Sequence, residues 1–390
     1  MPGPAKIISN KGLPRHVLGA AMIPLIAALA GCPTAPTDTA ETINPFQDLP
    51  EIARDGRAVA LTTTIAPLGA LNADEVIEVE VTGGAIDAVL ILAEDEVFDE
   101  AGVMVGGGPA NAAFNYRARD AGRYFAFVQF APTADDDARQ ATIQVQAGDP
   151  SHRPPATQAV RIVFEADYLT DPGLFDPDAG TDDQRAFLES ISDQVRDAII
   201  VRLEAIFADT PIVILDQDEP AGDAPVSRVT FRPDRVLAEA QDVIDSALPP
   251  LDTDRPECAD RVIFGEVLPE GSGLQDPGNQ TTDDEAVVYV GSFQGRGETC
   301  QSAAINSVNN IVLGLAQTAA HEIGHLVGLY HGSLVDLMDR SPSNAFQREL
   351  TFQRTQIVIE TPDEETIEPV VLTTVIQDPD RYFHANFSSQ

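Results

Sequence analysis

The sequence predicts an α+β protein in which an N-terminal all-β sandwich precedes an α/β domain. Three observations support this class. Apolar and polar residues alternate with period two over about residues 55–150, a long amphipathic helix pattern covers residues 181–207, and an apolar helix pattern follows several short strand patterns near residue 303. The chain has 390 residues, of which 43% are apolar. That is enough to fill more than one hydrophobic core.

The N-terminus has the pattern of an export signal. The first 37 residues contain no Asp or Glu, and Lys6, Lys11 and Arg15 precede the uncharged run "VLGAAMIPLIAALAGC". This run is too short to span a bilayer. Its ending, "LAGC", resembles the bacterial lipobox, which implies cleavage before Cys32 and a lipid on the Cys32 sulfur. We therefore expect residues 1–31 to be a lipoprotein signal peptide, with secretion after a small-residue site as the alternative.

Residues 32–54 are rich in Pro, Thr and acidic residues and lack an apolar period, so they are expected to form a tether. The expected location is the bacterial cell envelope, extracytoplasmic, with the lipid anchor holding the protein on a membrane. The 62 acidic residues outnumber the 24 Lys and Arg, which gives a net charge of −38. Such a surface repels phosphate groups, so no nucleic acid partner is expected. The oligomeric state is not indicated.

The sandwich, residues 55–150, is predicted from short strands separated by turn residues. The strand patterns are "EVIEVEVTG", "IDAVLIL", "AFNYR", "RYFAFVQF" and "ATIQVQA". In the first of these, Ile77, Val79 and Val81 share one face while Glu78 and Glu80 share the other. We interpret this domain as a support or spacer for the next one.

A Pro-rich break, "GDPSHRPPA", separates the sandwich from the second domain, residues 157–390. The strand patterns here are "QAVRIVFEA", "PIVILD", "SRVTFR", "RVIFGE" and "EAVVYVG". Helices are predicted over 181–207 and 303–328, because apolar residues recur there at intervals of three and four. Helix, strands and helix together indicate an α/β unit with a mixed sheet.

The stretch "HEIGHLVGLYH", residues 321–331, contains the candidate metal ligands and the candidate catalytic residue. His321 and His325 are four residues apart on a helix, so both imidazoles face the same way, about 6 Å apart along the axis. Gly328 allows the chain to reverse after the helix and bring His331 back to the same point. Three neutral imidazoles suit zinc and leave one position open for water, and Glu322 is placed to take a proton from that water.

The full pattern is H-E-x-x-H-x-x-G-x-x-H, with Met338 seven residues beyond the last histidine. It resembles the metzincin family of zinc endopeptidases, whose Met-turn lies beneath the metal. This resemblance implies one zinc ion on His321, His325 and His331, Glu322 as the general base, and Met338 as a hydrophobic floor. It also implies a protein or peptide substrate. The N-terminal domain, through "VEVTGGAIDAVLIL…AGRYFAFVQF", resembles the small β-sandwich domains that accompany bacterial secreted peptidases.

Several further interpretations follow from the sequence. An extended peptide substrate is expected to pair with an edge strand, for which "AVVYV" (residues 286–290) is the candidate. With Cys32 lipidated, Cys258 and Cys300 remain as a disulfide pair in an oxidising compartment, or as two free thiols. Asp336 and Asp339 either orient the groups around the metal or cap a turn. The acidic stretch 274–285 offers oxygen ligands for Ca²⁺ but lacks EF-hand spacing, which favours a solvated loop.

Two functions are compatible with these patterns. The first is a membrane-anchored zinc endopeptidase. The second is a surface adhesion or binding lipoprotein whose zinc site is structural or vestigial. Apart from both stands the alternative in which the histidines simply face solvent on a helix and hold no metal. The presence of Glu322 favours the enzyme, because a zinc site without activity could lose this residue and keep its metal.

Overall fold

The computed structural model describes most of the chain from residue 50 onward. The described residues are 50–94, 102–130, 139–169, 182–221, 226–234, 236–237, 262–263, 265–268, 278–279, 283–293, 307–333, 336–338, 349–360 and 369–387. Cys32, Cys258 and Cys300 lie outside these ranges, so the lipid anchor and the disulfide stay predictions. In the described part of the chain, no helix is both long enough and apolar enough to cross a membrane.

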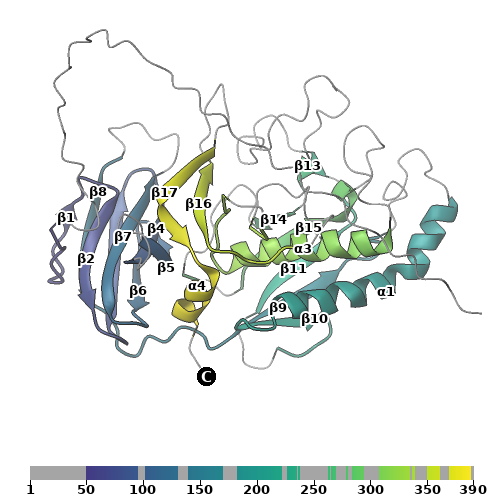
Figure 1. Ribbon diagram of the computed structural model, residues 1–390, viewed down its shortest axis with the longest axis horizontal. Helices are drawn as coiled ribbons and strands as arrows, with labels where there is room; N and C mark the ends of the chain where they lie inside the picture. Colours follow the sequence, from purple (N-terminus) through teal and green to yellow (C-terminus); the bar gives the residue numbers. More distant parts are fainter. Residues whose placement is uncertain are drawn as a thin grey trace, which may run out of the picture. The chain divides into compact units, whose positions relative to one another are not determined.

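Two sheets share one apolar core in the first part of the fold (Figure 1). The four-stranded sheet has the antiparallel order β1 (Val59–Ala60), β8 (Ala141–Ala147), β3 (Val76–Gly83), β6 (Ala113–Arg117). The six-stranded sheet has the order β16 (Thr355–Glu360), β17 (Pro369–Gln377), β5 (Gly102–Pro109), β4 (Ile86–Glu94), β7 (Gly122–Phe130), β2 (Ile65–Leu71). Val79 and Ile143 from the first sheet join Ile91 and Val128 from the second in the same buried cluster.

The strands that the period-two pattern predicted are present as β3, β4, β6, β7 and β8. The sequence patterns missed β1, β2 and β5, and also β16 and β17 near the C-terminus. Strand β2 contains Pro67 and Gly69, and its pairing with β7 shifts register between them. Strand β5 contains three successive glycines. Glycine and proline are turn signals in a sequence, so these two strands resembled connections.

The six-stranded sheet takes strands from both sides of the break predicted at residues 148–156. Strand β17 pairs in parallel with β5, from Val375 opposite Gly102 to Gln377 opposite Met104. Strand β16 pairs with the outer side of β17. The described residues all belong to one compact unit, and the predicted domain ranges 55–150 and 157–390 stay predictions.

A second layered region is built on a five-stranded sheet. Its order is β10 (Ile212–Asp216), β9 (Gln158–Phe164), β11 (Val226–Arg232), β15 (Glu285–Tyr289), β14 (Gly265–Leu268). Four of these strands are parallel, and β14 is antiparallel to β15. The predicted α+β class, with a mixed sheet, is therefore confirmed.

The remaining elements are β12 (Val236–Leu237), which pairs with β13 (Val262–Ile263), the short 3-10 helix η3 (Val290–Phe293), and the C-terminal helix α4 (Pro379–Asn386).

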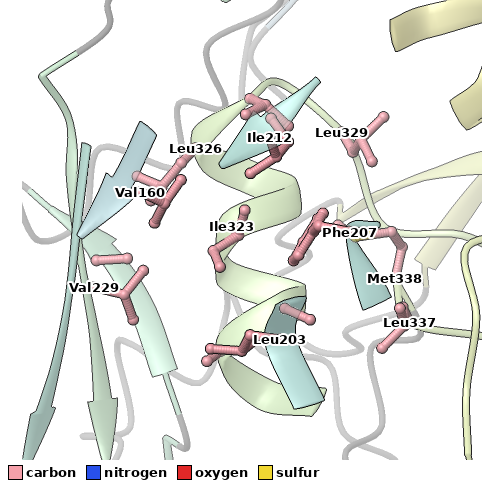
Figure 2. Close-up of a cluster of buried hydrophobic side chains, with 14 of the residues drawn as sticks. Val160, Leu203, Phe207, Ile212, Val229, Ile323, Leu326, Leu329, Leu337 and Met338 are labelled. Carbon is pink, nitrogen blue, oxygen red and sulfur yellow. The ribbon is translucent and has the colours of Figure 1, made fainter. Parts of the chain in front are cut away.

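Two helices pack against the five-stranded sheet and against each other: α1 (Asp182–Ile206) and α3 (Val308–Leu326). Figure 2 shows the core between them and the sheet, with Val160 and Val229 from the strands, Leu203 from α1 and Ile323 from α3. From Ile311 onward nearly every residue of helix α3 is buried, including the polar Gln317 and Glu322.

The edge-strand prediction for residues 286–290 was wrong. Strand β15 lies inside the sheet, between β11 and β14. The edge strands of this sheet are β10 and β14, and β14, next to α3, pairs with β15 alone among the described strands. A continuous apolar run such as "AVVYV" is typical of a strand with neighbours on both sides, and this signal outweighs its position just before the helix in the sequence.

Candidate metal centre

Helix α3 presents two of the three histidines. It begins at Val308, where the side chain of Ser307 accepts a hydrogen bond from the Asn310 backbone N–H. It therefore begins five residues later than the predicted position, residue 303. His321 and His325 lie in its last two turns and face one point, with their Nε2 atoms 3.0 Å apart.

The turn after α3 brings His331 to the same point. Gly328 has a φ of +93°, its N–H donates to the His325 carbonyl at 2.9 Å, and the Leu329 N–H donates to the Gly324 carbonyl at 2.8 Å. This is the Schellman arrangement, in which a glycine in the left-handed region reverses the chain. The Nε2 of His331 then lies 3.2 Å from that of His325 and 3.3 Å from that of His321. The three histidines form a group able to hold a metal ion.

Backbone carbonyls fix the orientation of two of the rings. The Nδ1 of His321 lies 2.7 Å from the Leu337 oxygen, and the Nδ1 of His325 lies 2.8 Å from the Leu329 oxygen. A carbonyl oxygen only accepts, so each Nδ1 carries the proton and donates it. In a neutral imidazole the Nε2 lone pair is then free. Both lone pairs point at the centre of the histidine group.

These features fit a tetrahedral cation. Lone pairs that converge at 3.0–3.3 Å repel one another unless a positive charge lies between them. A zinc ion with nitrogen ligands at about 2.0–2.1 Å in tetrahedral geometry separates those nitrogens by about 3.3 Å. The described distances match this requirement closely. Burial also lowers the pKa of His321 to about 4 and that of His325 to about 3, so both rings are neutral at pH 7.

The Met338 turn lies under the same helix. Met338 is fully buried, and Figure 2 shows it and Leu337 in the cluster that contains Ile323. Asp336, which is 1% exposed, accepts hydrogen bonds from the backbone N–H of Met338 at 2.9 Å and of Gln353 at 3.2 Å. Asp336 therefore caps the turn, one of its two predicted roles. The capped turn also positions the Leu337 carbonyl, which accepts the hydrogen bond from His321. Asp339 lies outside the described residues.

Glu322 is buried beside the histidines, at 4% exposure. Burial raises its pKa to about 8, and the nearby carboxylate of Glu266 on β14 adds to the effect. Glu266 itself accepts a hydrogen bond from the Tyr289 hydroxyl. The backbone of β14 touches Glu322 directly, since a Cβ at Gly265 would come 2.5 Å from the Glu322 Oε1. Only glycine lets the edge strand approach this closely.

The sequence singled out the histidines, Glu322 and Met338; the structure brings the three histidines to one point, buries Glu322 on the same helix and places Met338 against Gly324 of that helix. It did not locate Gly265, Glu266 or Gln377. Each of these sits in a short or irregular strand, and its relation to the site arises only when distant segments meet.

Of the acidic stretch predicted as a calcium loop or a solvated loop, only residues 278–279 and 283–285 are described, and they form no group with metal-ligand spacing.

No protein-family model matches the chain, and no curated protein matches its sequence. Among solved structures, the chain is 16% identical to the periplasmic lysozyme inhibitor PliG from Aeromonas hydrophila, over 25% of this chain and 92% of that one, with a TM-score of 0.20. It is 10% identical to a metallopeptidase in complex with Tn antigen, over 73% and 47%, with a TM-score of 0.15. It is 9% identical to a family two carbohydrate esterase from Cellvibrio japonicus, over 48% and 68%, with a TM-score of 0.13. Scores this low identify neither a shared fold nor a shared activity.

Proposed function

We propose that this protein is a zinc-dependent endopeptidase of the metzincin type. The observation that carries the proposal is the convergence of three Nε2 atoms, within 3.0–3.3 Å of one another, beside a buried glutamate at the edge of a sheet. The histidine lone pairs suit zinc, and Glu322 supplies no ligand to the group. The Met338 turn beneath the helix agrees with the same family.

Glu322 is the group that moves protons in this proposal. When bound, zinc would act as a Lewis acid that lowers the pKa of water and draws electron density from the scissile carbonyl. The same positive charge would lower the pKa of Glu322 from its metal-free value of about 8, so that the carboxylate can accept a proton. Glu322 takes the proton from the attacking water and passes it to the leaving amine.

The substrate chain is expected to pair with β14. This strand has one unpaired edge in the described sheet, and Gly265 brings its backbone against Glu322. An extended peptide that extends the sheet at β14 would place a scissile bond next to the carboxylate. The backbone provides the affinity in this mode, so unfolded or flexible proteins are the expected substrate class.

Cleavage of a broad peptide library tests the proposal. Wild-type protein should cleave, a chelator should abolish cleavage, and added zinc should restore it. Glu322→Gln should keep the fold and the zinc but lose activity by about 10²–10⁴-fold, the usual contribution of a general base. Wild-type protein that carries zinc and cleaves nothing would instead support a binding protein with a structural zinc site.

We also propose that the mature protein is anchored in the cell envelope through a lipid on Cys32, on the strength of the "LAGC" motif. The wild-type protein should partition into detergent, and Cys32→Ser should move it to the aqueous phase. A wild-type protein found wholly in the aqueous phase would refute the anchor. The Cys258–Cys300 disulfide is a separate proposal, which mass spectrometry of the unreduced protein would decide.

A further inference from the structure

The loop of residues 328–333, which we call the histidine loop, controls two of the three metal-ligand candidates. It carries His331 itself. It also carries the Leu329 carbonyl, which holds the Nδ1 of His325 at 2.8 Å. The position of this loop therefore sets where two of the three Nε2 atoms lie. Its position depends on contacts from outside α3, because Gly328 has already ended the helix.

Gln377 forms two hydrogen bonds with the centre of the histidine loop. Its Oε1 accepts a hydrogen bond from the Tyr330 N–H at 2.7 Å, and its Nε2 donates to the Tyr330 carbonyl at 2.9 Å. The Tyr330 N–H belongs to the peptide group whose carbonyl is that of Leu329, and the Tyr330 carbonyl belongs to the peptide group that begins His331. One side chain thus fixes both planar peptide groups that matter for the site. Gln377 is fully buried, so water does not compete for these bonds.

Gln377 is also the last residue of β17, which belongs to the six-stranded sheet. It lies opposite Met104 of β5, and one residue earlier Ile376 and Val103 form a small buried apolar pair. The far end of the histidine loop is held by β16, the strand paired with β17, because the Ser333 N–H donates to the Gln356 carbonyl at 3.0 Å. The sheet that contains the N-terminal strands therefore contacts the histidine loop at two points, Tyr330 and Ser333.

We propose that Gln377 is a positioning residue of the metal site, and that through it the six-stranded sheet sets how tightly the metal is held. The proposal rests on the three-histidine metal site of the proposed function. It gives the N-terminal strands a role beyond that of a spacer: they hold β17 in register, β17 holds Gln377, and Gln377 holds the peptide groups on either side of Tyr330. The side-chain amide is suited to this role because it both donates and accepts.

The rate of zinc transfer from the full mature chain to a chelating dye tests the proposal. Gln377→Met keeps the length and apolar stem of the side chain but loses both hydrogen bonds, and it should release zinc about tenfold faster, the lower end of the usual effect of outer partners. Asn386→Ala is the matched control. Asn386 is a buried amide that donates to the Val105 carbonyl of β5, the strand that pairs with β17, at 3.0 Å. None of its described hydrogen bonds reaches the histidine loop. Its zinc release should stay within about twofold of wild type.

Gln377→Glu adds a readout that a purely structural role would not produce, and it serves if Gln377→Met does not fold. A protonated Glu can donate and accept like Gln, whereas the ionised form repels the Tyr330 carbonyl. The ratio of its release rate to that of wild type should therefore rise with pH from about 5 to 8. Wild-type and Gln377 variants that release zinc at the same rate, with a flat ratio for Gln377→Glu, would overturn the inference alone. Wild-type protein that binds no zinc would overturn it together with the proposed site.

Discussion

The interior of the β-sandwich and the surroundings of the three histidines are both buried, but they are held in different ways. Apolar side chains from two sheets fill the sandwich, among them Val79, Ile91 and Ile143. The histidine region instead encloses polar groups, several of which bond backbone groups from other segments of the chain. Asp336 bonds the Gln353 N–H, and Gln377 bonds both backbone groups of Tyr330.

The difference teaches where each region is vulnerable. Apolar contacts are non-directional and numerous, so losing one methylene costs a limited amount and leaves the rest in place. A buried polar network is directional, and removing one member leaves its partners without hydrogen bonds in a low dielectric. We therefore expect substitutions around the histidines to disturb both stability and metal binding. Conservative substitutions in the sandwich core that leave β17 in register should disturb stability alone.

The largest expected effect is the loss of a ligand. His325→Ala leaves two imidazoles and removes the ring that the Leu329 carbonyl orients. Zinc affinity should fall by far more than the ten- to hundredfold that outer partners contribute, so the purified variant should carry almost no zinc in elemental analysis. His384→Ala, at an exposed histidine on α4, is the control and should carry as much zinc as wild type. Full zinc in His325→Ala would remove His325 from the site.

The second expected effect appears in the metal-free protein as pH changes. The pKa of Glu322 is raised from 4.5 to about 8 by burial, so between these values the folded state holds a proton that the unfolded state has released. The contribution of Glu322 to stability should then fall as pH rises from about 4.5 to 8, by at most about 1.4 kcal/mol per pH unit. The lowered pKa values of His321 and His325 act in the opposite direction below about pH 6.5, and they are common to wild type and Glu322→Gln. Glu322→Gln lacks this slope, and urea unfolding of both proteins at several pH values measures the difference. Parallel stability curves would contradict the buried, protonated carboxyl.

A smaller loss is expected from the Met338 turn. Asp336→Ala leaves the buried Met338 amide without its acceptor, which should cost about 1–3 kcal/mol in the free energy of unfolding. The Gln353 amide also loses its acceptor, but Gln353 is exposed and water can replace the lost bond. Asp336→Asn keeps one acceptor oxygen and should lose less. Denaturant unfolding of the metal-free proteins gives both values. Equal stability of wild type and Asp336→Ala would show that the turn does not depend on this carboxylate.

The smallest expected effect lies in the sandwich. Ile143 is fully buried in the core shared by the two sheets. Ile143→Val removes one methylene and should cost about 0.5–1.5 kcal/mol in the free energy of unfolding. The zinc release rate should not change, because no hydrogen bond of the histidine loop is altered. A release rate that rises as it does for Gln377→Met would erase the contrast between the two regions.

Local patterns predicted much of this molecule and non-local contacts account for the rest. The alternation of β3 and the four-residue spacing of His321 and His325 are properties of short segments, so the sequence alone indicated them. Strand β5 was not predicted because its glycines resemble a turn. The edge strand was misassigned because sheet order depends on which strands meet, and β14 has only four residues. No local signal connects Gln377 to Tyr330, which are 47 residues apart.

The coordination of zinc in the purified wild-type protein tests the central claim most directly. X-ray absorption at the zinc edge reports which atoms surround the ion and at what distance. The account predicts a spectrum with three imidazole nitrogens at about 2.0–2.1 Å and no sulfur. A shell that contains sulfur would assign the zinc to cysteines such as Cys258 and Cys300, and would contradict a site built by His321, His325 and His331.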